Sequence, residues 1–119
     1  MSDSFDGGRD SIYLRHILEC IAAIESYTEG GKVDFLENGL VSDGVLRRLQ
    51  VMAESTQRLS SGLKKAAPGI DWRALSGFRN VLVHDYLGGI DLEQVWMAIE
   101  HELPALKIEV GRLLRGLFD

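Results

Sequence analysis

Apolar residues recur at the three- and four-residue spacing of an amphipathic helix, and no stretch alternates as a half-buried strand does. Residues 1–9 are polar and contain glycine, so we expect them to be frayed. A first helix is predicted to begin at a cap formed by Asp10 or Ser11 and to end at Gly30 and Gly31. Its apolar stripe comprises Leu14, Ile17, Leu18, Ile21 and Ile24.

A second long helix is predicted to follow a short segment at 33–36 that suggests one helical turn. Ser42 or Asp43 should open this helix, and a turn at 66–69 should follow it. Its stripe comprises Val45, Leu49, Met52, Thr56, Leu59 and Leu63.

Two aspartates mark the starts of the remaining helices. Asp71 should cap a third helix that runs to Gly88 and Gly89, and Asp91 should cap the last, with Gln94 as its capping-box partner. Pro104 should kink or break the last helix, because proline lacks the backbone donor and clashes with the preceding turn. The last stripe comprises Leu92, Val95, Trp96, Ile99, Leu103, Leu106, Val110, Leu113 and Leu117.

These helical segments predict an all-α, up-and-down bundle of four to five helices. The chain has 119 residues, which suits a single domain over 1–119 with one hydrophobic core. It carries no apolar run of about 18 residues and no apolar leader, so we expect a cytoplasmic protein without a membrane partner.

The net charge and the small number of potential metal ligands limit the binding partners and cofactors that the chain can have. With 13 Lys+Arg against 18 Asp+Glu, the formal net charge is −5, so contact with nucleic acid would need a local basic spot. Arg47 and Arg48 offer one, although an exposed helix face is the simpler interpretation. The single cysteine, Cys20, shares no ligand-like spacing with His16 or His101, so we expect no metal and no cofactor.

The segment 71–89 carries the candidate chemistry. On a helical wheel, one sector of about 100° holds the residues Leu75, Phe78, Arg79, Leu82 and Tyr86. The opposite side holds Arg73, Gly77, Asn80 and His84. A helix that is apolar on more than one side is normally buried between two layers, and in so small a bundle the second layer is most easily a partner subunit. We therefore expect a homodimer with both copies of Asn80 and His84 near its two-fold axis.

Each polar residue of this segment has an ordinary structural interpretation. A lone histidine usually caps a helix or lies at the edge of a core, an arginine beside an apolar stripe usually reaches solvent, and a terminal tyrosine usually packs its ring. The functional interpretation gains weight because Arg79, Asn80, His84 and Asp85 occur within one short stretch.

This stretch resembles the HepT-like proteins, a branch of the HEPN superfamily. Arg79, His84 and Tyr86 match the Arg-x4-His-x-Tyr motif of that family. The similarity extends to residues 13–19, 27–30, 43–49, 71–73, 89–92, 95–96 and 103–106. One departure is Ala53-Glu54-Ser55, where the family often has Gly-Glu-Ala and where the glutamate is kept.

The resemblance implies a HEPN-like bundle and the toxin of a toxin–antitoxin pair. It implies that the toxin is a metal-independent ribonuclease, silenced by a cognate minimal nucleotidyltransferase that adds AMP to the motif tyrosine. Carried over by position, the catalytic residues are Arg79 and His84, and the AMP acceptor is Tyr86. Asn80 and Asp85 would support them, with RNA as the substrate.

The chemistry suits these residue types but leaves their geometry open. Histidine can act as a general base or acid near neutral pH, and a guanidinium can hold a phosphate. One chain offers one motif histidine, so two require a dimer. Arg79 and His84 are separated by about 140° on an ideal helix. Arg79 must therefore reach round the helix, the helix must be distorted, or the site must combine two chains.

A second function remains open at this point. In a non-catalytic binding module, Arg79, Asn80 and His84 would hold the dimer together or dock the nucleotidyltransferase. The acidic net charge favours this alternative slightly, and the complete motif favours the nuclease.

Overall fold

The computed structural model describes residues 7–73, 75 and 89–117. This part of the chain contains helices and no strand, so the predicted all-α class is confirmed. The helices whose bounds fall within the described residues are α1 (Gly7–Tyr27), α2 (Gly31–Glu37), α3 (Gly39–Gln57), α4 (Ser61–Lys65), α6 (Leu92–His101) and α7 (Leu103–Gly116).

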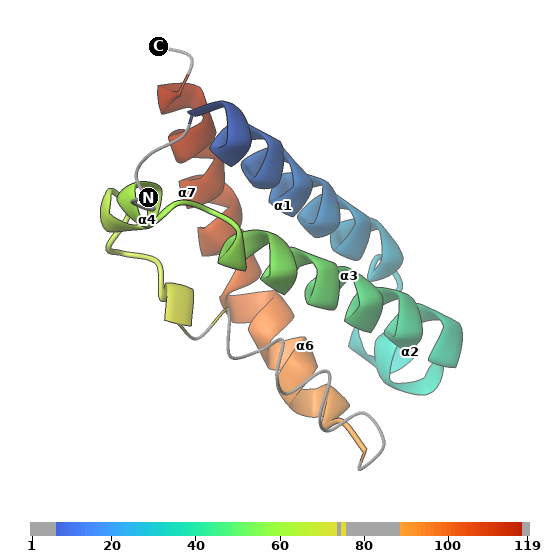
Figure 1. The fold of residues 1–119 in the computed structure, drawn as a ribbon. Helices are drawn as coiled ribbons and strands as arrows, with labels where there is room; N and C mark the ends of the chain where they lie inside the picture. Colours follow the sequence, from blue (N-terminus) through green and yellow to red (C-terminus); the bar gives the residue numbers. More distant parts are fainter. Residues whose placement is uncertain (1–6, 74, 76–88, 118–119) are drawn as a thin grey trace.

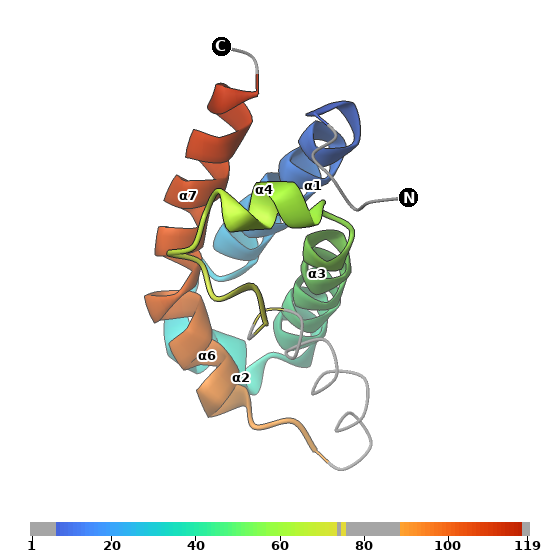
Figure 2. The same ribbon diagram turned by 60° about the vertical axis from the view of Figure 1, so that its left-hand side comes forward.

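Three long helices, α1, α3 and α7, lie side by side and form the body of the bundle (Figure 1). The Lys107 ammonium lies 3.1 Å from the Glu25 carboxylate, which joins the start of α7 to the end of α1 and shows that they run in opposite directions. Figure 2 shows α2 at one end of the bundle and α4 across the other. None of the helices in the described ranges is long and apolar enough to cross a membrane.

The predicted apolar stripes form the core. Among the most deeply buried residues are Leu14, Ile17, Ile21, Ile24, Val45, Leu49, Met52, Thr56, Leu59, Leu63, Val95, Leu103, Leu106, Val110 and Leu113. Phe35 of α2 is fully buried, and its ring centroid lies 5.4 Å from that of Trp96 on α6. The short α2 is therefore held by an aromatic contact, which explains why it extends beyond the single turn predicted.

The start of α1 differs from the sequence prediction. The helix begins at Gly7, so a cap at Asp10 or Ser11 is wrong, and residues 7–9 are helical. Asp10 is fully buried, and its carboxylate accepts hydrogen bonds from the backbone N–H of Ser60 (2.8 Å) and from its hydroxyl (2.6 Å). The Asp10 side chain thus contacts a distant segment instead of capping the helix, and α1 begins about one turn before it.

The second long helix also begins earlier than predicted. Asn38, not Ser42 or Asp43, caps α3, because its side-chain oxygen accepts a hydrogen bond from the Leu40 N–H (3.1 Å). The chain then leaves the helix after Gln57 and starts α4 at the Ser60 cap, whose hydroxyl accepts from the Leu63 N–H (3.2 Å). The predicted stripe through Leu63 is buried throughout but belongs to two helices.

Two of the C-terminal predictions are confirmed, namely the cap at Asp91 and the break before Pro104. Asp91 caps α6 by accepting hydrogen bonds from the N–H groups of Glu93 (3.0 Å) and Gln94 (3.4 Å). The predicted break at Pro104 falls at Glu102, between α6 and α7, and places the proline in the first turn of α7. A proline is tolerated there because the first turn of a helix needs no intrahelical N–H donor.

We predict that Asp10→Ala lowers the free energy of unfolding by about 2–3 kcal/mol, because it leaves two buried donors of Ser60 without their acceptor. Urea denaturation measures the change. The matched control is Glu19→Ala on the exposed side of α1, which should stay within about 0.5 kcal/mol of wild type. Equal stability of the two variants would contradict this role for Asp10.

Candidate functional site

The motif residues Arg79, Asn80, His84, Asp85 and Tyr86 lie outside the described residues, as does Gly77. The structure describes the two ends of the 71–89 segment that carries them. The predicted start is confirmed, because Trp72 is the first helical residue and the Leu75 N–H donates to the Asp71 carbonyl (3.2 Å).

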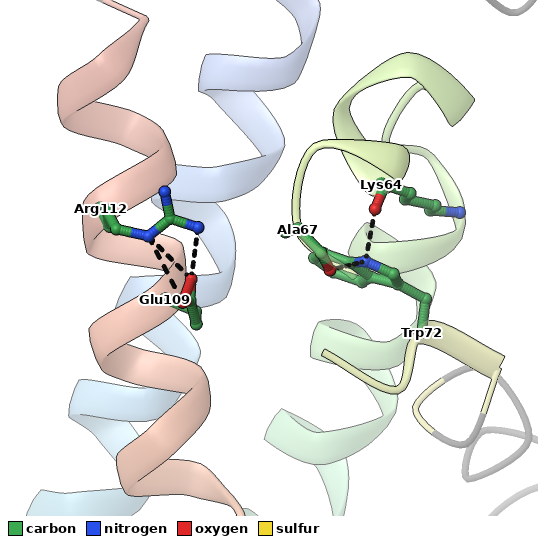
Figure 3. Close-up of polar contacts among 5 residues, drawn as sticks. All are labelled: Lys64, Ala67, Trp72, Glu109 and Arg112. Atoms are coloured by element: carbon green, nitrogen blue, oxygen red, sulfur yellow. Dashed lines mark hydrogen bonds and ion pairs between the residues drawn. The ribbon is translucent and has the colours of Figure 1, made fainter. Parts of the chain in front are cut away.

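Trp72 anchors the upstream end of this segment. Its indole N–H donates to the carbonyls of Lys64 (3.2 Å) and Ala67 (3.1 Å), and Figure 3 shows the ring lying against the turn that follows α4. Both carbonyls lie at the turn that ends α4, and each also accepts a backbone hydrogen bond, Lys64 from the Ala67 N–H and Ala67 from the Ile70 N–H (3.2 Å each). Trp72 therefore holds the start of the motif segment against the end of α4 and the turn that follows it.

The downstream end is held by a glycine and a cap. Gly89 has φ +88°, a left-handed conformation that favours glycine over residues with a side chain. The half-buried Ile90 then packs against the core, and the Asp91 cap starts α6. The motif segment is thus tied to α4 at one end and to α6 at the other.

A surface hollow of about 250 Å³ borders the start of the motif segment. Its lining includes the apolar side chains of Ile70, Leu75, Ala105 and Leu106. Around them lie the carboxylates of Asp71, Glu102 and Glu109 and the imidazole of His101. Carboxylates repel a phosphodiester, so this hollow is poorly suited to holding RNA phosphates.

The other titratable residues considered in the sequence are His16, His101 and Cys20. His16 is exposed, and its Nδ1 lies 3.3 Å from the Ser55 hydroxyl. His101 is also exposed. Burial raises the pKa of the Cys20 thiol, which keeps it protonated and therefore a poor nucleophile. No three His, Cys, Asp or Glu side chains in the described ranges are grouped to hold a metal ion.

The two basic residues singled out in the sequence, Arg47 and Arg48, do not form a joint patch. Arg47 is exposed, and its guanidinium lies 3.4 Å from the side-chain oxygen of Gln50. Arg48 is half-buried and donates a hydrogen bond to Tyr27, which raises the pKa of the guanidinium. Arg48 is therefore committed to a contact between α3 and α1.

The fold and the motif together define an all-helical protein of the HepT-like class. The sequence model described as HepT-like, Ribonuclease HepT-like, matches residues 17–113, which include the whole motif segment. The chain therefore belongs to the HepT-like ribonuclease family.

Two of the similar proteins come from archaea. A Thermococcus cleftensis protein named "Probable ribonuclease HepT" is 32% identical over 102 residues, 85% of this chain and 92% of that protein. A Methanocaldococcus jannaschii protein named "Gamma-glutamylcyclotransferase and putative RNase" is 32% identical over 107 residues, 89% of this chain. The match covers 48% of that protein, so this chain spans about half its length. No solved structure matches the chain.

We expect Trp72→Phe to lower the free energy of unfolding by about 1 kcal/mol, because the phenyl ring keeps most of the packing but cannot donate to the Lys64 and Ala67 carbonyls. The unfolding midpoint in urea gives the change. The neighbouring exposed Arg73→Gln should leave the midpoint unaltered. An unchanged midpoint in Trp72→Phe would show that the indole hydrogen bonds do not hold this end of the segment.

Proposed function

We propose that this protein is an endoribonuclease that cleaves RNA without a metal ion and is the toxin of a toxin–antitoxin pair. The observation that carries the proposal is the complete Arg79-x4-His84-x-Tyr86 motif inside the region matched by the ribonuclease family. The ribonuclease names of the archaeal relatives support it.

The reaction needs two proton transfers and one charge clamp. A base takes the proton of a ribose 2′-hydroxyl, the 2′-oxygen bonds to the adjacent phosphorus, and the bond from phosphorus to the 5′-oxygen breaks. An acid then protonates the leaving 5′-oxygen, which gives a 2′,3′-cyclic phosphate and a 5′-hydroxyl. His84 fits the proton transfers, and Arg79 fits the clamp on the charge that grows on the phosphate.

A homodimer would supply both transfers. Each chain has one motif histidine, so a base and an acid of this type require two copies of His84. The apolar character of the motif segment on more than one side supports a second copy as its cover. Asn80 lies on the same side of the wheel as His84 and, with Asp85, would support the site from within the segment.

We expect Arg79→Ala and His84→Ala each to lower RNA cleavage by a factor of about 10² or more, the range typical for loss of a general acid–base or charge-stabilising group. Cleavage of a labelled RNA in EDTA measures the loss. Unchanged circular dichroism would show that the fold is retained. His101→Ala and Arg47→Ala are the matched controls and should cleave as wild type does.

The same assay tests the dimer and the alternative function. The specific activity should fall when wild-type protein is diluted, because monomers lack the second His84. Retained activity in His84→Ala would remove this residue from the mechanism. Absence of cleavage at every concentration, with binding to a nucleotidyltransferase intact, would favour a non-catalytic binding module, which the net charge of −5 also suits.

Silencing is proposed to occur at Tyr86. A cognate minimal nucleotidyltransferase would join the phosphorus of AMP to the Tyr86 hydroxyl oxygen, with pyrophosphate leaving when ATP is the donor. The new phosphodiester carries a negative charge seven residues from Arg79 on the same side of the wheel. It would compete with an RNA phosphate for that guanidinium.

Tyr86→Phe should fold, cleave RNA and escape the antitoxin, because it keeps the ring but lacks the acceptor oxygen. Intact-mass measurement after co-expression with the nucleotidyltransferase tests this. Wild type and the control Tyr27→Phe should gain one or more AMP masses and Tyr86→Phe none. Equal modification of Tyr86→Phe would exclude Tyr86 as the acceptor and leave silencing to simple binding.

A further inference from the structure

Charged side chains are segregated along the length of the bundle. At the end formed by α2 and the starts of α3 and α6, carboxylates dominate, namely Glu29, Asp34, Glu37, Asp43, Asp91 and Glu93. The Lys32 ammonium at this end is bound to Glu93 (2.8 Å). At the other end, exposed or half-buried cations gather. We call this set the basic end, and it comprises Arg9, Arg58, Lys64, Lys65, Arg112 and Arg115.

The basic end is assembled from segments that are distant in sequence. Figures 1 and 2 both show the start of α1, the end of α3, α4 and the last turns of α7 at the same end of the bundle. The Asp10 carboxylate binds Ser60, which brings the residues next to Arg9 and Arg58 into contact. The buried Leu63 and Leu113 belong to the same core cluster, which joins α4 and α7 beneath the charged surface.

The carboxylates of the described residues at this end include Asp10, Glu54 and Glu109, and each of them has a partner. Asp10 is fully buried and occupied by Ser60, and Glu109 is bound by the Arg112 guanidinium at 2.7 Å (Figure 3). Glu54, on α3, is half-buried. Asp3, Asp6 and Asp119 lie outside the described residues and are present in every variant below.

The basic end is directly connected to the motif segment. The Lys64 carbonyl accepts a hydrogen bond from Trp72, seven residues before Arg79, while the Lys64 ammonium extends away from the indole (Figure 3). The exposed Arg73 follows Trp72 and adds a cation beside this contact. By contrast, the hollow at Leu75 is surrounded by Asp71, Glu102 and Glu109. Cations are therefore found at α4 and Arg73, and carboxylates around the hollow.

We propose that the basic end is a second RNA-binding surface, which holds the phosphodiester backbone of single-stranded RNA outside the catalytic residues. The inference rests on the proposed ribonuclease function, which makes RNA the polyanion to be bound. The separated charges give the protein a strong electrostatic asymmetry, and this field would orient an incoming RNA with its backbone toward α4 and away from α2. An acidic protein can in this way bind RNA through one local surface.

Salt dependence measures this surface directly. The affinity for a single strand falls with salt, with a log–log slope of about −0.7 for each neutralised phosphate. The test variant is Lys64→Gln/Lys65→Gln/Arg115→Gln, and the control is Lys32→Gln/Arg47→Gln/Lys107→Gln. Both carry the same change in net charge. The control variant also breaks the ion pairs of Lys32 with Glu93 and of Lys107 with Glu25, both far from the basic end.

Binding is measured by fluorescence anisotropy with a labelled oligouridine strand, on the full chain with His84→Ala added to prevent cleavage. We expect the test variant to lose about 2 units of slope and about 100-fold in affinity near 0.1 M salt, as three lost phosphate contacts require. The control should keep the slope of its parent. The single variant Lys65→Gln should lose about 0.7 units of slope.

Equal slopes for the test and control variants would overturn the proposal. It would also be overturned if the test variant kept RNA binding but lost binding to phosphatidylglycerol vesicles, since the surface would then serve lipid. The same substitutions made with His84 intact distinguish the two proposals. If the protein with His84 intact never cleaves RNA but the test variant loses RNA binding, only the ribonuclease function is refuted. If the test variant cleaves and binds RNA as its parent does, only the basic end is refuted.

Discussion

The buried carboxylate of Asp10 is the contact on which much of the arrangement depends. It accepts two hydrogen bonds from Ser60, and the Ser60 hydroxyl in turn accepts from the Leu63 N–H. These bonds fix the start of α4 against the first turns of α1. The carbonyls of Lys64 and Ala67, at and just after the end of α4, then hold the Trp72 indole at the start of the motif segment. A buried side chain near the start of α1 therefore contributes to where that segment begins.

The same contact shapes the electrostatics. The bonds from Ser60 to Asp10 bring the first turn of α1, which carries Arg9, next to the segment that joins α3 to α4. The cations of α3, α4 and α7 can then act together at one end of a molecule whose net charge is −5. The total charge suggests a poor partner for RNA, whereas its distribution offers a surface that suits a polyanion.

Particular residues show how far the sequence predicts the fold and the candidate site. The apolar stripes of α1 and α7 predict which residues enter the core, because a period of 3.6 residues places the apolar side chains on one face of a helix. The Asp91 cap and the break near Pro104 can also be predicted from the sequence, because both depend on neighbours within four residues. The predicted cap at Asp10 is wrong because this side chain binds Ser60 instead. The predicted cap at Ser42 is wrong because Asn38 caps the helix four residues earlier. The motif itself was found from its residue types and spacing, and its geometry stays a prediction.

The sequence by itself determined the helical class, the core stripes and the family motif, since each is written in local spacing and residue type. The tertiary structure decided what depends on distant neighbours. It divided the second stripe between α3 and α4, gave Asp10 a partner fifty positions away, and placed the Trp72 indole against the carbonyls of Lys64 and Ala67. It also gathered Arg58, Lys65 and Arg115 at one end of the bundle. No local pattern records that gathering, because the electrostatic field depends on distances in space and not on order along the chain.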